Sequence, residues 1–312
     1  MPCVRAEAHA KINLSLSVRP GADATGYHEV ETVVCPLELA DSITVRLAAP
    51  GAGITLACSP DPVEGDPRGA AANLAYRAAE ALARELGRDA ACEIFLEKAI
   101  PTQAGLGGGS ADAAAVIRCL AELWGVFPSG RLDPFDERLL RVASGLGADV
   151  AACLFDAPVL LTGRGDVPRE AFAPVSAPLA LVKPAAGVPT AAAYRKLDEL
   201  GVAPVLVEPV AEALRRGDAQ AAIGHAGNSM TLPALALAPE LGDVFAFLSS
   251  SDGVLGEPLL CGSGSCVAAF TAGDSAAADV ARDAREAGWW SCATRTYASS
   301  YAPCGAPCAK IS

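Results

Sequence analysis

The sequence predicts an α+β protein built from two domains. The chain has 312 residues, which is long for a single hydrophobic core. Strand and helix patterns alternate along it without the regular strand–helix–strand rhythm of a doubly wound parallel sheet. A glycine-containing turn at residues 163–166 follows the last strand pattern of the first half. We therefore expect an N-terminal domain at residues 1–165 and a C-terminal domain at residues 166–312.

Composition and charge narrow the class of partner. Hydrophobic residues make up 52% of the chain and charged residues 19%, as in an ordered globular protein. The net charge of −12 argues against a nucleic-acid or anionic-membrane surface. The first residues lack the apolar segment of a secretory signal, and no apolar run approaches the length of a membrane span. We expect a cytoplasmic protein with no nucleic-acid or membrane partner.

The 11 cysteines are scattered along the chain and include no Cys-x-x-Cys pair. Small buried residues in a reducing compartment are the simplest interpretation. Cys304 and Cys308 are close in sequence, but none of the three histidines is near them. A metal site at this pair is therefore disfavoured, and we assign no metal ligand.

The first strand pattern covers residues 4–18. Every even position is apolar and every odd position is polar or charged, so the two sets lie on opposite faces of a strand. Lys11 and Asn13 share the polar face, with His9 one step earlier. That face either meets solvent or lines a cleft, and the pattern by itself leaves both open.

The remaining elements follow from periodicity and from turn residues. In the first half, helices are predicted at 74–86, capped by Asn73, and at 134–144. Strands there are predicted at 30–39 (interrupted at Pro36), 41–47, 54–58, 92–96 and 159–161. In the second half, strands are predicted at 179–182, 259–261, 266–270 and 290–297. The helices of that half are predicted at 190–200, 209–216, 233–248 and 274–287.

A glycine-rich stretch at residues 101–115 stands between a strand pattern and a helix pattern. Four glycines precede Ser110, which is predicted to be the N-cap of the helix that follows. Such a helix start offers free N–H groups and a positive dipole end, so it can hold a phosphate. The spacing fits neither the Walker A loop nor the dinucleotide fingerprint. A structural turn and a phosphate site both remain open, and the four glycines before a helix favour the phosphate site.

Asp149 is an acidic residue that lies between two predicted elements and not on the polar face of a predicted helix. Asp149 follows the glycines at 145 and 147 and precedes an apolar run at 150–155. Its position alone is compatible with a turn or capping aspartate as well as with a functional carboxylate.

Taken together, the motifs resemble the GHMP kinases, the family of galactokinase, homoserine, mevalonate and phosphomevalonate kinases. The resemblance runs from residue 10 to about 270 in the expected order. It is carried by Ala10-Lys11-Ile12-Asn13-Leu14, by Gly26-Tyr27-His28 and by the 101–115 stretch with its triple glycine. Further matches are Gly147-Ala148-Asp149-Val150, Gly262-Ser263-Gly264-Ser265, Asn73-Leu74, Val188-Pro189-Thr190, Ala193-Tyr194 and Asn228.

The resemblance implies a fold and a reaction. Its N-terminal domain would be similar to the second domain of a ribosomal small-subunit protein, its C-terminal domain would be ferredoxin-like, and the active site would lie between them. The implied reaction uses ATP and Mg²⁺ to phosphorylate the 2-hydroxyl in the erythritol part of a cytidine diphosphate conjugate. That step belongs to the methylerythritol phosphate route to isoprenoid precursors. The partner would be this small molecule, and the protein a monomer or a homodimer.

The resemblance also assigns catalytic roles. Asp149 is expected to act as the general base, and Lys11 to keep it ionised and to neutralise the transferring phosphoryl group. Asn13 would orient the substrate.

Other residues are assigned to binding in the same way. Tyr27 and Tyr194 would sandwich the cytosine, His28 would read its polar edge, and Thr190 would bind the substrate. The residues expected at ATP are Pro101, Ala104, Gly105, Leu106, Gly107, Gly108, Gly109, Ser110 and Asn73.

The chain departs from the family pattern at a few positions. His9 stands where proline is common, Cys261 and Cys266 where hydroxyl residues are common, and Thr231 where an acidic residue is common. Asp112 is expected to point away from the phosphates, with a water-mediated role at Mg²⁺ as the alternative.

Three other functions compete with this reaction. They are a GHMP kinase for a different alcohol, a non-catalytic nucleotide-binding relative and an NAD-dependent oxidoreductase. The tyrosines and His28 argue against the first, and the presence of Lys11 and Asp149 argues against the second. The loop spacing argues against the third.

Overall fold

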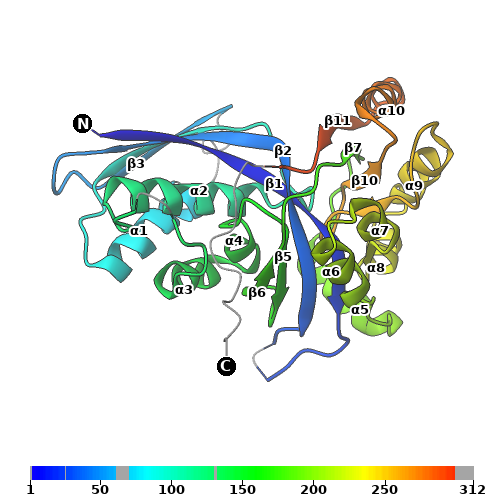
Figure 1. Cartoon of the computed structure of the whole chain (residues 1–312), viewed down its shortest axis with the longest axis horizontal. Helices are drawn as coiled ribbons and strands as arrows, with labels where there is room; N and C mark the ends of the chain where they lie inside the picture. Colours follow the sequence, from blue (N-terminus) through cyan, green and yellow to red (C-terminus); the bar gives the residue numbers. More distant parts are fainter. Residues whose placement is uncertain (1, 25, 61–69, 130–131, 299–312) are drawn as a thin grey trace.

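The computed structural model describes residues 2–24, 26–60, 70–129 and 132–298. Within these residues the chain forms two sheets, each with helices packed against it (Figure 1). The cysteines at 304 and 308 lie outside the described residues. No helix in the described part is long and apolar enough to cross a membrane.

The first sheet has the strand order β3-β4-β2-β1-β8, with β5 paired to β2 and β6 paired to β5. Its strands are β1 Cys3–Val18, β2 Val30–Leu47, β3 Ile54–Ser59, β4 Cys92–Glu97, β5 Val159–Thr162, β6 Val167–Ala171 and β8 Gly227–Asn228. The alternating pattern therefore predicted β1 correctly. β2 is continuous, whereas we predicted an interruption at Pro36. The register of β1 against β2 shifts between His9 and Lys11, opposite Pro36, and a bulge of this kind accommodates a proline inside a strand.

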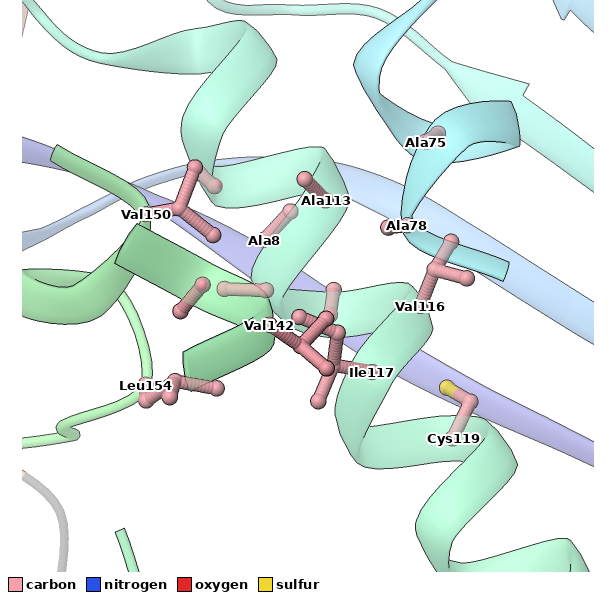
Figure 2. Packing of buried hydrophobic residues seen from close by; sticks show 14 of the residues in the cluster. Ala8, Ala75, Ala78, Ala113, Val116, Ile117, Cys119, Val142, Val150 and Leu154 are labelled. Carbon is pink, nitrogen blue, oxygen red and sulfur yellow. The ribbon is translucent and has the colours of Figure 1, made fainter. Parts of the chain in front are cut away.

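Helices α1 Leu74–Leu86, α2 Gly108–Leu123, α3 Glu137–Leu146 and α4 Ala148–Ala152 cover one face of this sheet (Figure 1). Their contacts are built from small side chains: Ala75 and Ala78 of α1 lie near Ala113 and Val116 of α2 (Figure 2). Alanine lets two helices approach closely, and nearly all of α2 from Ala111 onward is buried. The start of α2 is therefore held by a rigid core.

The second sheet is antiparallel, with the strand order β11-β7-β10-β9. Its strands are β7 Pro178–Lys183, β9 Leu259–Leu260, β10 Val267–Phe270 and β11 Trp290–Arg295. In chain order this is 4-1-3-2, the arrangement of a ferredoxin-like domain, as the resemblance implied.

The helices of the second half are α5 Thr190–Leu200, α6 Glu208–Arg215, α7 Ala219–Gly224, α8 Thr231–Leu237, α9 Leu241–Ser250 and α10 Asp274–Glu286. We predicted one helix at 233–248, and this was wrong: α8 and α9 are separate. Ala238, the C-cap of α8, leaves the helical region with φ −136° and ψ 83°, because the following Pro239 disfavours a helical residue before it. The short α7 was not predicted.

The predicted domain boundary at 165/166 falls inside a β-hairpin, since β5 pairs with β6. The first sheet continues to Ala171 and the second begins at Pro178, so strand pairing favours a boundary between them. β8, from the second half, returns to the first sheet by parallel pairing with β1. The two halves are thus joined along β1, and their junction lies close to Asn13.

Candidate active site

A cavity of about 630 Å³ lies where β1, the glycine-rich loop, α4 and segments of the second half meet. The predicted site residues that line it are Lys11, Asn13, Gly105, Ser110, Asp149, Thr190 and Tyr194. Residues lining it that we did not single out include Thr32, Gln103, Arg164, Gly165, Met230 and Ser263. The fold thus brings together residues from position 11 to position 264 of the sequence.

Lys11 and Asp149 form an ion pair at the wall of this cavity. The Lys11 Nζ lies 3.4 Å from Asp149 Oδ2 and donates a hydrogen bond of 2.9 Å to Asn13 Oδ1. The lysine side chain is 4% exposed and the Asp149 side chain is 44% exposed. The ammonium is therefore held in place, and the carboxylate remains accessible to a ligand.

A hydrogen-bonded chain fixes Asn13. Its Nδ2 donates to Thr32 Oγ1 at 2.9 Å, and the Thr32 hydroxyl donates to the Ser15 carbonyl at 2.6 Å. β1 is buried on both faces here, and Lys11 and Asn13 of its polar face line the cavity instead of meeting open solvent. This resolves the alternative that the alternating pattern left open.

The glycine-rich loop packs directly on Lys11. The Lys11 N–H donates to the Leu106 carbonyl at 2.9 Å, and a Cβ on Gly107 would lie 2.9 Å from Lys11 Cγ. Gly107 has φ +71°, which a side chain rarely adopts. The loop therefore needs a glycine next to the lysine for both steric and conformational reasons.

Helix α2 begins at Gly108, so the prediction that Ser110 is its N-cap was wrong. Gly107 is the N-cap and makes no side-chain capping bond. Its left-handed conformation turns the chain into the helix three residues earlier than predicted, and the Ala111 N–H already bonds to the Gly107 carbonyl at 2.8 Å. Ser110 lies in the first turn, where its hydroxyl and the free N–H groups can both contact an anion.

Segments of the second half close the cavity. A Cβ on Gly262 would lie 3.3 Å from Lys11 Nζ, so this glycine lies beside the ammonium. Asn228 Nδ2 donates to the Gly262 carbonyl at 2.7 Å, and the Thr190 and Ser263 hydroxyls are 2.9 Å apart.

The two cysteines around this motif do not line the cavity. Both Cys261 and Cys266 are fully buried, and their backbones hydrogen-bond to each other. Burial raises the pKa of the Cys266 thiol well above its usual range. We therefore expect the thiols to act through packing and not through contact with a substrate.

The aromatic residues gather at one end of the cavity. Tyr194 lines it, and burial raises the pKa of its phenol to about 12, so the ring is neutral. The His28 ring centroid is 4.9 Å from that of Tyr194. Tyr27 is half-exposed, and the Arg164 guanidinium lies over its ring at 4.6 Å. Tyr27 and His28 thus stand beside the cavity-lining residues and not in the wall itself.

Asn73, which we expected at ATP, is not among the residues that line the cavity. It caps α1, as predicted, with Oδ1 accepting from the Ala75 N–H at 2.9 Å.

Some cavity-lining residues were not predicted as site residues. Of these, Gln103 and Ser263 lie inside glycine motifs that were recognised. Arg164 lies in a turn that we interpreted only as a junction.

A buried charge cluster lies beneath the start of α2. Lys98 donates to Asp41 and, at 2.5 Å, to Asp112 Oδ2, and Asp41 also accepts from the Ile100 N–H at 2.8 Å. Asp112 is 3% exposed and does not line the cavity, so it points away as predicted, and a role at Mg²⁺ is not supported. Burial raises the pKa of Asp112 to about 7, against the opposing effect of Lys98.

This cluster predicts a pH-dependent stability. The carboxyl of Asp112 binds its proton near pH 7 when folded but near 3.8 when unfolded, so the folded chain loses stability as pH rises between these values. Asp112→Asn imitates the neutral form. We expect the free energy of unfolding of this variant to be close to that of the parent near pH 4 and about 1–3 kcal/mol higher near pH 8, by chemical denaturation. A difference that stays constant with pH would contradict this prediction.

Comparison with known proteins identifies the family. Residues 73–157 match the family described as GHMP kinases N terminal domain. A 4-diphosphocytidyl-2-C-methyl-D-erythritol kinase of Pelotomaculum thermopropionicum is 40% identical over 299 residues, which cover 94% of this chain and 98% of that protein. The chain belongs to the GHMP kinase family. As a GHMP kinase, it is an ATP-dependent phosphotransferase.

Other GHMP kinases agree with this assignment. A kinase of the same name from Parvibaculum lavamentivorans is 36% identical, covering 91% of this chain and 94% of its own. The crystal structure of a 4-(cytidine 5′-diphospho)-2C-methyl-D-erythritol kinase has a TM-score of 0.75 at 33% identity, covering 95% and 100%. A homoserine kinase from Cytophaga hutchinsonii shares the fold, with a TM-score of 0.69 at 19% identity.

Proposed function

We propose that this chain transfers the γ-phosphoryl group of ATP to the 2-hydroxyl of 4-diphosphocytidyl-2-C-methyl-D-erythritol. The observation that carries the proposal is the Lys11–Asp149 pair, whose charged atoms are 3.4 Å apart at the wall of the cavity. The glycine-rich loop and Tyr194 line the same cavity. We call Tyr194, with His28 and Tyr27 beside it, the aromatic cluster. The relatives named for this reaction match nearly the whole chain. The reaction would belong to the methylerythritol phosphate route and take place in the cytoplasm.

In this proposal Asp149 is the general base. Its carboxylate accepts the proton of the substrate hydroxyl as that oxygen forms a bond to the γ-phosphorus and the bond to the ADP oxygen breaks. Lys11 offers a fixed positive charge 3.4 Å from this carboxylate and stabilises the negative charge of the transferring group. Asn13, held by Thr32, orients Lys11 and offers an amide to the substrate.

ATP would bind on the loop at residues 101–110. Gly105 and Ser110 line the cavity, and the start of α2 supplies free N–H groups and the positive end of its dipole. Mg²⁺ takes most of its oxygen ligands from phosphates and water, and the Ser110 hydroxyl is an oxygen donor at this wall. Bound Mg²⁺ would neutralise phosphate charge. Asn73 stays a weaker proposal for an adenine contact because its Oδ1 is engaged as a cap.

The cytidine end of the substrate would occupy the aromatic cluster. Tyr194 and Tyr27 would stack on the base, His28 would read its edge, and Thr190 would contact the diphosphate part. Stacking on one aromatic ring is worth about 1–3 kcal/mol in single-strand binders, so two rings would anchor a base strongly. We expect the protein to act as a monomer or a homodimer.

Turnover by the purified protein tests the proposal. With ATP·Mg²⁺ we expect phosphorylation of the cytidine diphosphate conjugate and no comparable rate with homoserine or mevalonate. Phosphorylation of a small alcohol in preference would indicate a different member of the family. Absence of any transfer would favour a non-catalytic relative, although Lys11 and Asp149 are both present.

A further inference from the structure

A carboxylate outside the cavity wall contacts the histidine of the aromatic cluster. The His28 Nε2 lies 3.0 Å from each carboxylate oxygen of Asp198. The His28 side chain is 9% exposed and that of Asp198 is 37% exposed. The sequence did not predict Asp198 as a site residue.

Helix α5 explains why these groups meet. Tyr194 and Asp198 are four residues apart on α5, so they lie one turn apart on the same face of the helix. Tyr194 lines the cavity and packs on the His28 ring, while Asp198 binds the Nε2 of that ring. One face of α5 therefore supplies both an aromatic wall and the partner of the histidine.

The contact determines which nitrogen of the ring carries the proton. A carboxylate is an acceptor only, so Nε2, which lies beside Asp198, carries the ring proton whenever the imidazole holds just one. Nδ1 then carries a lone pair and acts as an acceptor. The other bond of Asp198 is from the Gly21 N–H at 2.8 Å, and this bond, followed by His28, holds the pKa of Asp198 below its usual range. The carboxylate is thus charged and anchored before any ligand binds.

We propose that Asp198 is a positioning residue that selects cytosine over uracil by fixing the tautomer of His28. This rests on the proposed function, in which His28 reads the base. Cytosine presents an amino group, which donates to a bare Nδ1, whereas uracil presents a carbonyl oxygen at the same place. Two acceptors facing each other lose a hydrogen bond and leave buried polar atoms unpaired.

The tautomer can be measured without any ligand. The chain has three histidines, so the ring nitrogens are assignable by ¹⁵N–¹H correlation spectra of the full-length protein and of His28→Gln. At about pH 8, where imidazole is neutral, we expect the parent His28 to be protonated on Nε2. In Asp198→Ala we expect a mixture of tautomers. A parent His28 protonated on Nδ1, or an unchanged pattern in Asp198→Ala, would overturn the proposal.

The ratio of the affinities for CDP and UDP is the second measurement. We expect the parent to bind CDP at least about tenfold more tightly than UDP, and Asp198→Ala to lose most of that ratio. Asp198→Glu, which keeps a carboxylate, should retain part of it. Glu199→Ala removes the neighbouring exposed carboxylate, which pairs with Lys196, and should leave the ratio unchanged.

Asp198 also accepts a hydrogen bond from the Gly21 N–H, so its role could be only to anchor the loop before Tyr27, and this alternative can be tested. If Asp198 only anchors the loop before Tyr27, its removal should weaken CDP and UDP equally and preserve the ratio, which would overturn the proposal. Equal affinity of the parent for CDP and UDP would overturn it as well. Failure of the proposed function has a different signature, because selective CDP binding without phosphoryl transfer would refute the reaction and leave the role of Asp198 intact.

Discussion

Asp149→Asn should bind ATP nearly as well as the parent but lose its turnover. Asparagine keeps the shape of the side chain but cannot accept the hydroxyl proton, and general base catalysis contributes about 10²–10⁴-fold to a rate. Asp149 lies on α4 and not in the loop at 101–110 that would hold the ATP phosphates, so we expect nucleotide binding not to depend on it directly. We expect kcat to fall by about that factor, with the affinity for ATP changed by less than about threefold.

The matched control is Asp279→Asn, which removes an exposed carboxylate on α10 that pairs with Arg282. It should keep the parent rate. A turnover for Asp149→Asn within a few-fold of the parent, in steady-state assays with the cytidine diphosphate conjugate, would show that another group accepts the proton.

Gly105→Ala should destabilise the protein and damage the ATP loop at the same time. A Cβ on Gly105 would lie 1.8 Å from the carbonyl oxygen of Cys261, and its φ of +75° is unfavourable for alanine. The two loops meet here through backbone atoms, since the Cys266 N–H also donates to the Ala104 carbonyl. A clash with backbone cannot be relieved by a side-chain rotation, so the loops must move apart.

The expected cost is about 3 kcal/mol or more in the free energy of unfolding, measured by chemical denaturation, together with a large loss of activity. Gly145→Ala is the control, because it lies within α3, and a Cβ there would meet nothing within 4 Å. Alanine is a better helix former than glycine, so this variant should be stabilised by up to about 1 kcal/mol. A Gly105→Ala protein as stable and active as the parent would mean that the loops are not in contact.

Most of the secondary structure could be predicted because it depends on local patterns. The alternation in β1, the Asn73 cap of α1 and the span of α5 follow from periods of two and 3.6 residues and from side-chain capping. One error arose from a local signal that we missed, since Pro239 separates α8 from α9. Another arose from a neighbour in space: Gly107, not Ser110, is the N-cap of α2, in a loop that packs on Lys11.

Strand partners are harder to predict than the strands themselves. We proposed a domain boundary at the turn 163–166, and the structure shows that β5 and β6 pair across this turn and extend the first sheet to Ala171. Strand pairing depends on hydrogen bonds between segments, and periodicity within one segment contains no information about its partner. The return of β8 to β1, which joins the two halves near Asn13, could not be predicted for the same reason.

For the site, the sequence supplied the candidate groups: a lysine and an amide on one strand, an aspartate after a glycine pair, and a glycine-rich helix start. The tertiary structure determines which of these groups meet. It brought Lys11 within 3.4 Å of Asp149, turned Asp112 toward Lys98, and set Asp198 against His28. These are contacts across 138, 14 and 170 residues, and they arise from the packing of helices and sheets, which no local pattern encodes.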